Sequence, residues 1–119
     1  MKLAQRTAIV TGGAAGIGRA IAEALAREGA NIVIADRRGA ERAAAEMEMA
    51  GHRALGLTAD VTSESDMTRM ADAAEARFGG IDVLVANAAI FSTLKPKPFE
   101  ELSADEWRQV MDVNTLGVF

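Results

Sequence analysis

Hydrophobic residues along this chain follow two different periods, which alternate from the N-terminus onward. Continuous apolar runs, typical of strands covered on both faces, occupy residues 7–10, 31–35, 54–59 and 81–86. Between these runs apolar residues recur three or four positions apart, which predicts helices over residues 16–28, 40–50 and 63–78 and a fourth after residue 103. The alternation of strands and helices favours a doubly wound α/β fold, in which helices cover the faces of a parallel sheet.

The apolar stripe of each predicted helix identifies the side chains that should face the sheet. On the outer face of the first helix, Glu23 and Arg27 are four residues apart and are expected to form an ion pair. The expected inward residues are Ile17, Ala20, Ile21, Ala24 and Leu25 in the first helix; Ala43, Ala44 and Met47 in the second; Met67, Met70, Ala71, Ala74 and Phe78 in the third; and Trp107, Val110, Met111, Asn114 and Val118 in the fourth.

Two of the helices begin at recognisable capping signals. Ser63 followed by Asp66 resembles a capping box, and Ser103 followed by Glu106 has the full capping-box pattern. The pair Gly79-Gly80 should end the third helix, because glycine readily adopts the left-handed conformation found at helix ends.

Composition narrows the classes of protein to which the chain can belong. With 119 residues, half of them apolar, it is long enough for one domain, residues 1–119, with one core. The net charge is −4 and the cations are scattered, which argues against a nucleic-acid partner. No cysteine is present, as is common in cytoplasmic proteins, and no apolar run is long enough for a membrane span. The single His52 has no companion ligands, so we expect no metal site.

The segment Thr11–Gly18 reads T-G-G-A-A-G-I-G and lies between the first predicted strand and the first predicted helix. Glycine permits a tight turn and lets a phosphate approach the backbone, and a helix N-terminus presents free N–H groups to it. A tight turn without a ligand is the alternative explanation of the glycines. The context favours a dinucleotide, because Asp36 ends the second strand twenty residues after Gly16, where a ribose-binding acid is expected.

These residues together resemble the N-terminal half of a classical short-chain dehydrogenase/reductase. The family's T-G-x-x-x-G-x-G is complete at Thr11–Gly18, and its acid after the second strand matches Asp36. Its Asp-Val after the third strand matches Asp60-Val61. Its N-N-A-G is partly kept as Ala86–Ala89, and its helical active-site Asn matches Asn114. The resemblance covers the whole chain and implies a Rossmann-like sheet with strand order 3-2-1-4, of which the first four strands and four helices are present.

The resemblance implies a cofactor site and assigns its parts. Asp36 would bind the adenosine ribose, and Asp60 with Val61 would contact the adenine. Asp36 favours NAD(H), since its carboxylate would repel a 2′-phosphate. The implied cofactor-binding residues are Gly12, Ala15, Gly16, Ile17, Gly18, Asp36, Arg37, Asp60, Val61, Asn87, Ala88 and Ala89.

Of the family's catalytic residues, the resemblance places only Asn114 in this chain, where it would anchor a water in a proton relay. The family's Ser and its Tyr-x-x-x-Lys pair follow the fourth helix, and this chain contains no Tyr. We therefore expect the 119-residue chain alone to be inactive and Phe119 to be a truncation or the limit of an ordered region. The apolar fourth strand and fourth helix should then lack cover and associate with other chains. The intact parent is expected to be a cytoplasmic homotetramer or dimer.

Several functions remain open from the sequence. The first is hydride transfer between NAD(H) and an alcohol or ketone by the intact protein. NADP(H)-dependent reduction, as in a 3-oxoacyl reductase, is an alternative, because Arg37 and Arg38 follow Asp36. A nucleotide-binding module without catalysis is another. A methyltransferase also uses a glycine loop and an acid after the second strand, and binding of S-adenosylmethionine would reveal it. The substrate itself cannot be read from these residues.

Overall fold

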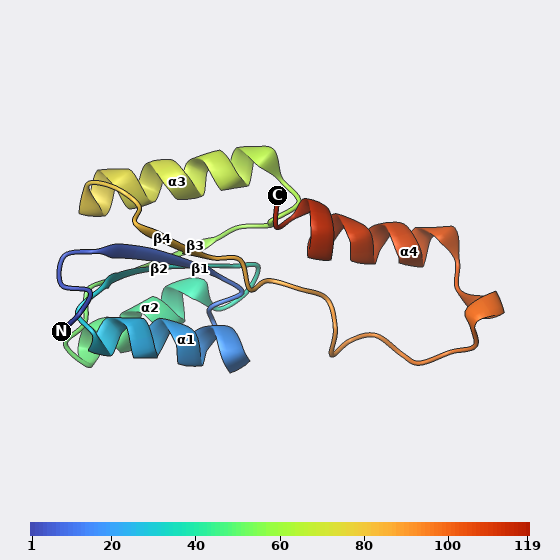
Figure 1. Cartoon of the computed structure of the whole chain (residues 1–119), viewed down its shortest axis with the longest axis horizontal. Coiled ribbons are helices and arrows are strands. Elements are labelled where there is room, and N and C mark those ends of the chain that lie inside the picture. Colours follow the sequence, from blue (N-terminus) through green and yellow to red (C-terminus); the bar gives the residue numbers. More distant parts are fainter.

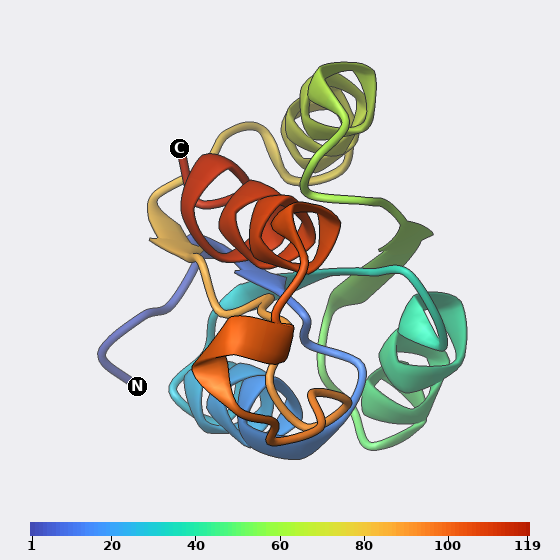
Figure 2. The same ribbon diagram turned by 90° about the vertical axis from the view of Figure 1, so that its right-hand side faces the viewer.

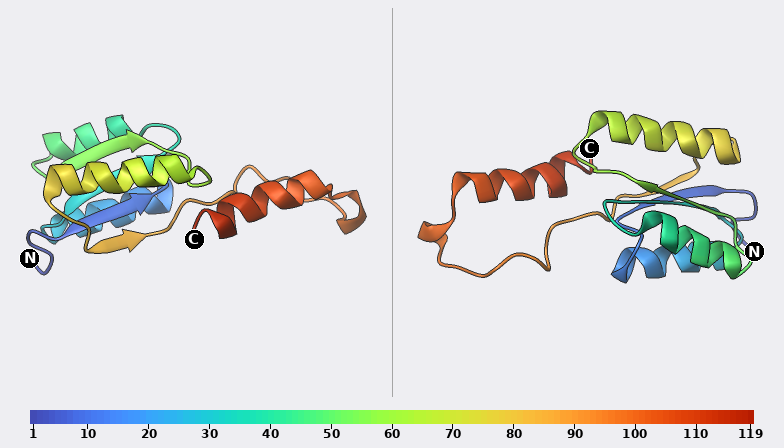
Figure 3. Two further views of the ribbon diagram at one scale, coloured as in Figure 1. Left: turned by 90° about the horizontal axis from the view of Figure 1, so that it is seen from above. Right: turned by 180° about the vertical axis from the view of Figure 1, so that it is seen from behind.

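The sheet has four parallel strands in the order β3-β2-β1-β4, as predicted. A computed structural model describes all 119 residues. In the register, Ile9 of β1 lies opposite Val33 of β2 on one side and Leu84 of β4 on the other. All strands point toward the end of the molecule where α4 lies (Figure 3, left). The strands are β1 (Thr7–Thr11), β2 (Asn31–Asp36), β3 (Ala54–Thr58) and β4 (Val83–Val85).

Helices cover both faces of this sheet (Figures 1 and 2). α1 (Gly16–Arg27) and α2 (Ala40–Met49) lie on one face, and α3 (Glu64–Phe78) lies on the other. α4 (Ala104–Met111) begins after a loop that contains the short 3-10 helix η1 (Phe99–Glu101), and it continues into the π-helical turn η2 (Asp112–Leu116). This last part extends beyond the ends of the strands, so the molecule is elongated, 50 × 25 × 23 Å. No helix is both long and apolar enough to cross a membrane.

The core forms two layers because successive side chains of a strand point to opposite faces. Val10 and Ile34 pack with Met47 of α2 on one face. Ile9 and Val33 pack on the other face, in the same layer as Met70 and Ala74 of α3. Each buried Val or Ile contributes about 1.5–3 kcal/mol of hydrophobic stabilisation. The predicted inward faces of α2 and α3 are therefore confirmed where their residues reach these layers.

The predicted inward face of α1 is wrong for three of its five residues. The buried positions are Gly18, Ala22 and Ala26, whereas Ile17 is 76% exposed. Ala20 and Ala24 are also exposed, and only Ile21 and Leu25 pack partly against the core. The helix follows the short glycine loop and its first turn lies close against that loop, so small residues make the contact. A pattern that gives weight to large apolar side chains misses them.

The ion pair predicted on α1 also has a different partner. Glu23 accepts a hydrogen bond from Arg19 Nε at 2.7 Å, and Arg27 forms no ion pair. Arg19 reaches Glu46 of α2 at 3.1 Å with a second nitrogen, so it joins the two helices. The predicted pair Glu23–Arg27 and the observed pair Arg19–Glu23 both have i,i+4 spacing. The additional contact with Glu46 of α2 favours Arg19 as the partner.

The two helix starts differ from each other. At Ser103 the capping box is complete, as predicted: its hydroxyl accepts from the Glu106 N–H, and the Glu106 carboxylate accepts from the Ser103 N–H. At Ser63 only half forms, because the hydroxyl accepts from the Asp66 N–H while the Asp66 carboxylate accepts from the Asp60 N–H. Asp66 therefore fixes the preceding loop instead of closing the box. Gly79 ends α3 with φ +87°, as predicted.

The fourth helix and the fourth strand are shorter and more exposed than the other elements. The predicted single helix through Val118 changes to a π-helical turn after Met111, where the Gly117 N–H donates to the Asp112 carbonyl oxygen at 2.7 Å. Trp107 is 66% exposed and Leu84, on the edge strand β4, is 57% exposed. The expectation that these apolar surfaces lack cover within the chain is confirmed.

Candidate functional site

A cleft of about 380 Å³ lies at the carboxyl ends of the strands. Ligands of open α/β sheets bind at this end, because the loops after the strands meet there. The cleft brings together most of the residues that the sequence predicted for the cofactor. These are Gly12, Ala15, Asp36, Arg37, Asp60, Val61, Asn87, Ala88 and Ala89.

Three of the predicted cofactor residues do not line the cleft, and five residues that were not predicted do. Gly16, Ile17 and Gly18 lie at the start of α1, outside the lining. Ala35 and Ala59 also line the cleft. Each directly precedes one of the two acids predicted for the site, and this position in the sequence could have identified them. The sequence analysis also missed the lining residues Ile90, Ser92 and Val113, which carry no chemical signal of their own.

The glycine loop has the conformation and the free donors expected of a phosphate cradle. Gly12 and Gly16 have φ of +65° and +58°, values that L side chains rarely adopt. A side chain on Gly18 would clash with the Gly12 carbonyl oxygen. Because glycine has no side chain, α1 can begin close to β1. The N–H groups of Gly16, Ile17 and Gly18 make no hydrogen bond within the chain. Helix N-termini with free N–H groups of this kind attract anions.

Asp36 is held beside this loop by the backbone. One of its carboxylate oxygens accepts a hydrogen bond from the Ala14 N–H at 3.1 Å, and the other accepts from the Arg38 N–H at 3.4 Å. Each oxygen keeps a lone pair for a further donor. The half-buried Asp36 carboxylate thus stands at the rim between the glycine loop and the end of β2.

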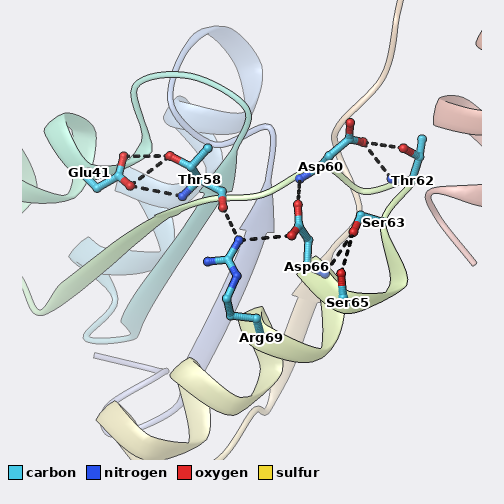
Figure 4. A network of polar contacts seen from close by, with 8 residues as sticks. All are labelled: Glu41, Thr58, Asp60, Thr62, Ser63, Ser65, Asp66 and Arg69. Carbon is cyan, nitrogen blue, oxygen red and sulfur yellow. Dashed lines mark hydrogen bonds and ion pairs between the residues drawn. The ribbon is translucent and has the colours of Figure 1, made fainter.

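Asp60 lies in the loop between β3 and α3 (Figure 4). Its Oδ1 accepts from the Thr62 N–H at 2.9 Å and from the Thr62 hydroxyl at 2.7 Å. These two bonds, in that order, hold the pKa of Asp60 below its usual value, and the charge of Arg37 acts in the same direction. Partial burial acts against them. Arg37 Nε is 3.9 Å from Asp60 Oδ2, so both side chains border the same part of the cleft.

The fourth strand is joined to the glycine loop by Asn87 and Thr11. The Asn87 side-chain amide donates to the carbonyl oxygens of Thr11 and Gly12 at 3.1 and 3.2 Å. In return, the Thr11 hydroxyl oxygen accepts from the backbone N–H groups of Asn87 and Ala88, both at 3.1 Å. Three nitrogen atoms of the turn are therefore fixed relative to the loop, and Ala88 and Ala89 border the cleft.

Asn114 lies in the π-helical turn, and its side chain is fully engaged with one residue. Its Oδ1 accepts from the Ile90 N–H at 2.7 Å, and its Nδ2 donates to the Ile90 carbonyl oxygen at 2.9 Å. The half-buried side chain thus fastens η2 to the loop after β4. π-Helical turns occur frequently at functional sites, and the preceding residue, Val113, lines the cleft.

Comparison with known proteins agrees with this architecture. The chain belongs to the short chain dehydrogenase family, whose sequence model matches residues 6–119. It is 47% identical over 117 residues to the cis-4-hydroxycyclohexanecarboxylate dehydrogenase of Sinomonas cyclohexanicum, covering 97% of this chain and 46% of the relative. It is 38% identical over 120 residues to glucose 1-dehydrogenase 2 of Bacillus subtilis, covering 98% and 46%.

A solved structure confirms the fold. The structure of a protein described as a short-chain dehydrogenase from Novosphingobium aromaticivorans aligns with a TM-score of 0.88 at 37% identity. The alignment covers 98% of this chain and 42% of that one. The chain thus spans about half the length of the curated relatives that it matches.

Proposed function

We propose that this chain binds a nicotinamide dinucleotide in the cleft, and that the intact protein transfers hydride between this cofactor and an alcohol or ketone. The observation that carries the proposal is the placement of Asp36 beside a glycine loop with free N–H groups. Two relatives support it: one is named for dehydrogenation of a hydroxycyclohexanecarboxylate and the other for dehydrogenation of glucose. The cofactor supplies or accepts the hydride when it is bound.

The cleft and the adjoining start of α1 together suit the successive parts of the dinucleotide. The N–H groups of Gly16, Ile17 and Gly18 would donate to the pyrophosphate. Asp36 would accept from the adenosine ribose hydroxyls, as an acid after the second strand does in dinucleotide-binding folds. Asp60 would accept from the adenine amino group. The backbone of Asn87, Ala88 and Ala89 would border the nicotinamide ribose.

The preferred cofactor in this proposal is NAD(H), not NADP(H). A 2′-phosphate would meet the Asp36 carboxylate, one oxygen of which accepts from the Ala14 N–H of the glycine loop. Position 15, within that loop, is alanine and offers no cation. Arg37, the basic residue nearest the ribose acid in sequence, lies 3.9 Å from Asp60 and is drawn toward the adenine side.

Titration of the full-length protein with both cofactors tests the proposal. Calorimetry should give a lower Kd for NAD⁺ than for NADP⁺. Asp36→Ala should bring the ratio of these two Kd values closer to one. Asp105→Ala, a change on the exposed side of α4, is the matched control and should leave the ratio unchanged. Tighter binding of NADP⁺ would refute the preference for NAD. Binding of S-adenosylmethionine without either dinucleotide would overturn the whole proposal.

Asn114 is proposed to take part in catalysis in the intact protein, by anchoring a water in the proton relay. The role is supported by Val113, which precedes Asn114, and by Ile90, to which its side chain is bonded, because both line the cleft. Because Ile90 occupies both ends of the side-chain amide, contact with that water would fall to the Asn114 backbone. Asn114→Ala should therefore act by releasing Ile90 and displacing the turn, lowering kcat in a steady-state assay of the full-length protein. An unchanged kcat would remove Asn114 from the mechanism.

The proposal includes a cytoplasmic protein that forms a homotetramer or dimer. The absence of cysteine suits a reducing compartment, and Trp107 on α4 offers an exposed apolar side chain. Sedimentation of the full-length protein should show a tetramer or dimer, and fractionation should place it in the cytoplasm. A monomer at micromolar concentration would contradict the assembly.

A further inference from the structure

Only one oxygen of the Asp60 carboxylate is engaged by its own loop. The Thr62 N–H and the Thr62 hydroxyl both donate to Oδ1, at 2.9 and 2.7 Å. The nearest charged partner of Oδ2 is Arg37 Nε, at 3.9 Å, which is longer than a hydrogen bond. Figure 4 shows that both contacts from Thr62 end on the same oxygen of Asp60. A carboxylate is planar, so fixing Oδ1 at two points also fixes the direction of Oδ2.

The backbone of Asp60 is held as firmly as its side chain. Its N–H donates to Asp66 Oδ2 at 2.9 Å, and its carbonyl oxygen accepts from the Ser63 N–H at 3.0 Å. Asp66 is itself held by Arg69, 3.4 Å away on the next turn of α3. Rotation about the side-chain bonds is therefore the freedom that Asp60 retains, and Thr62 is the residue that restricts it.

Thr62 itself does not line the cleft, and its side chain is exposed. We propose that the Thr62 hydroxyl is a positioning residue for adenine recognition: it holds Oδ1 of Asp60 so that Oδ2 is presented to the 6-amino group of adenine. The inference rests on the proposed function, since it assumes a dinucleotide in the cleft. It adds a residue that acts through Asp60 without touching the cofactor.

The adjacent Val61 N–H allows the contribution of Asp60 to be measured separately. This N–H makes no hydrogen bond within the chain and belongs to a residue of the cleft lining. It can donate to N1 of the adenine ring, whereas Asp60 can only accept, and so needs the 6-amino group. A purine that lacks the amino group but keeps N1 would lose the Asp60 contact alone.

The test compares NAD⁺ with nicotinamide purine dinucleotide, in which hydrogen replaces the 6-amino group. Calorimetry on the full-length protein gives a Kd for each, and their ratio reports the amino-group contact. Hydrogen bonds to a charged partner predict a preference for NAD⁺ of about tenfold in the wild type. Thr62→Val, which removes the hydroxyl and keeps the shape, should reduce it to about threefold or less.

Three controls isolate the hydroxyl of Thr62. Thr62→Ser restores a hydroxyl and should restore the ratio. Thr68→Val makes the same substitution at an exposed position on α3 that has no hydrogen bond to Asp60, and should leave the ratio unchanged. In an Asp60→Asn background, Thr62→Val should change the ratio no further, because the two residues act through one contact.

The outcomes separate this inference from the proposed function. A full preference for NAD⁺ in Thr62→Val would overturn the inference, and so would an equal loss of affinity for both dinucleotides, which is what a merely structural role predicts. No preference in the wild type would also overturn it while leaving dinucleotide binding intact. Failure of the wild type to bind either dinucleotide would instead refute the proposed function.

Discussion

Thr11 offers the sharpest test of how the fold builds the cleft. It is 5% exposed, and its hydroxyl oxygen accepts from the N–H groups of Asn87 and Ala88, both at 3.1 Å. Thr11→Val keeps the shape of the side chain but leaves the Ala88 N–H without its acceptor, while the Asn87 N–H keeps the Val85 carbonyl oxygen at 3.0 Å. An unsatisfied buried donor costs about 1–3 kcal/mol. Valine recovers part of this cost through its additional methyl group, which is worth about 0.8 kcal/mol.

The net expectation is a loss of about 1–2 kcal/mol in the free energy of unfolding. Urea denaturation of the full-length protein measures it, with an unchanged m value as the sign that the native state keeps its compactness. The dinucleotide affinity should fall as well, because the turn at Asn87 loses two of the bonds that fix it to the glycine loop.

The same strand supplies a matched control at its other end. Thr7 is 1% exposed, and its hydroxyl accepts a single long bond, 3.4 Å from Asn31 Nδ2. Thr7→Val should cost about 1 kcal/mol or less and leave dinucleotide affinity unchanged. If Thr11→Val costs no more than Thr7→Val, the hydroxyl does not hold the turn and the reasoning is refuted.

Three further predictions concern the remaining parts of the cleft. Gly18→Ala should destabilise the full-length protein by about 1–3 kcal/mol and weaken dinucleotide binding, because the new methyl group meets the Gly12 carbonyl oxygen. Gly80→Ala, at an open position, is the control in the same urea titration. Equal losses of stability in the two variants would contradict the packing argument. Asp60→Ala should raise the cofactor KM with little change in kcat, because it removes a contact that is equally strong in the ground state and in the transition state. A large fall in kcat at saturating cofactor would disprove a role of Asp60 in binding alone. The pKa of Asp60 is lowered in the folded chain, so its contribution to stability is complete above the ordinary value of about 3.9 and is lost as pH falls through the lowered value. The difference in unfolding free energy between wild type and Asp60→Asn, measured against pH, should therefore shrink only at acidic pH; a difference that already shrinks between pH 5 and 7 would contradict the direction of the shift.

Local sequence patterns were sufficient for the order of elements and for the chemical residues of the cleft. Buried parallel strands need continuous apolar runs, and helices need a stripe, so the two periods gave four strands and four helices in the right places. Asp36 and Asp60 could be placed at one end of the sheet, because all carboxyl ends of parallel strands lie together. The strand order followed from the family resemblance and is confirmed.

Contacts between elements decided what the patterns missed. The buried face of α1 depends on how closely the helix approaches β1, and this distance is set by Gly18 against Gly12 and not by hydrophobicity. The Asp66 carboxylate accepts a hydrogen bond from the Asp60 N–H at 2.9 Å and so does not close the capping box that its spacing from Ser63 resembles. Both outcomes depend on the position of a second segment, which helical spacing alone does not contain.

Asn114 and the π-helical turn around it also separate what the sequence predicts from what only the structure shows. The sequence identified Asn114 by its motif, and only the structure revealed that both ends of its amide bind the backbone of Ile90. Nothing in the residues 112–116 themselves predicts i→i+5 hydrogen bonds. The sequence by itself therefore determined which elements form and which polar groups the cleft receives, because these depend on neighbours along the chain. The tertiary structure decided which donor meets which acceptor, because that depends on distances between segments far apart in the sequence.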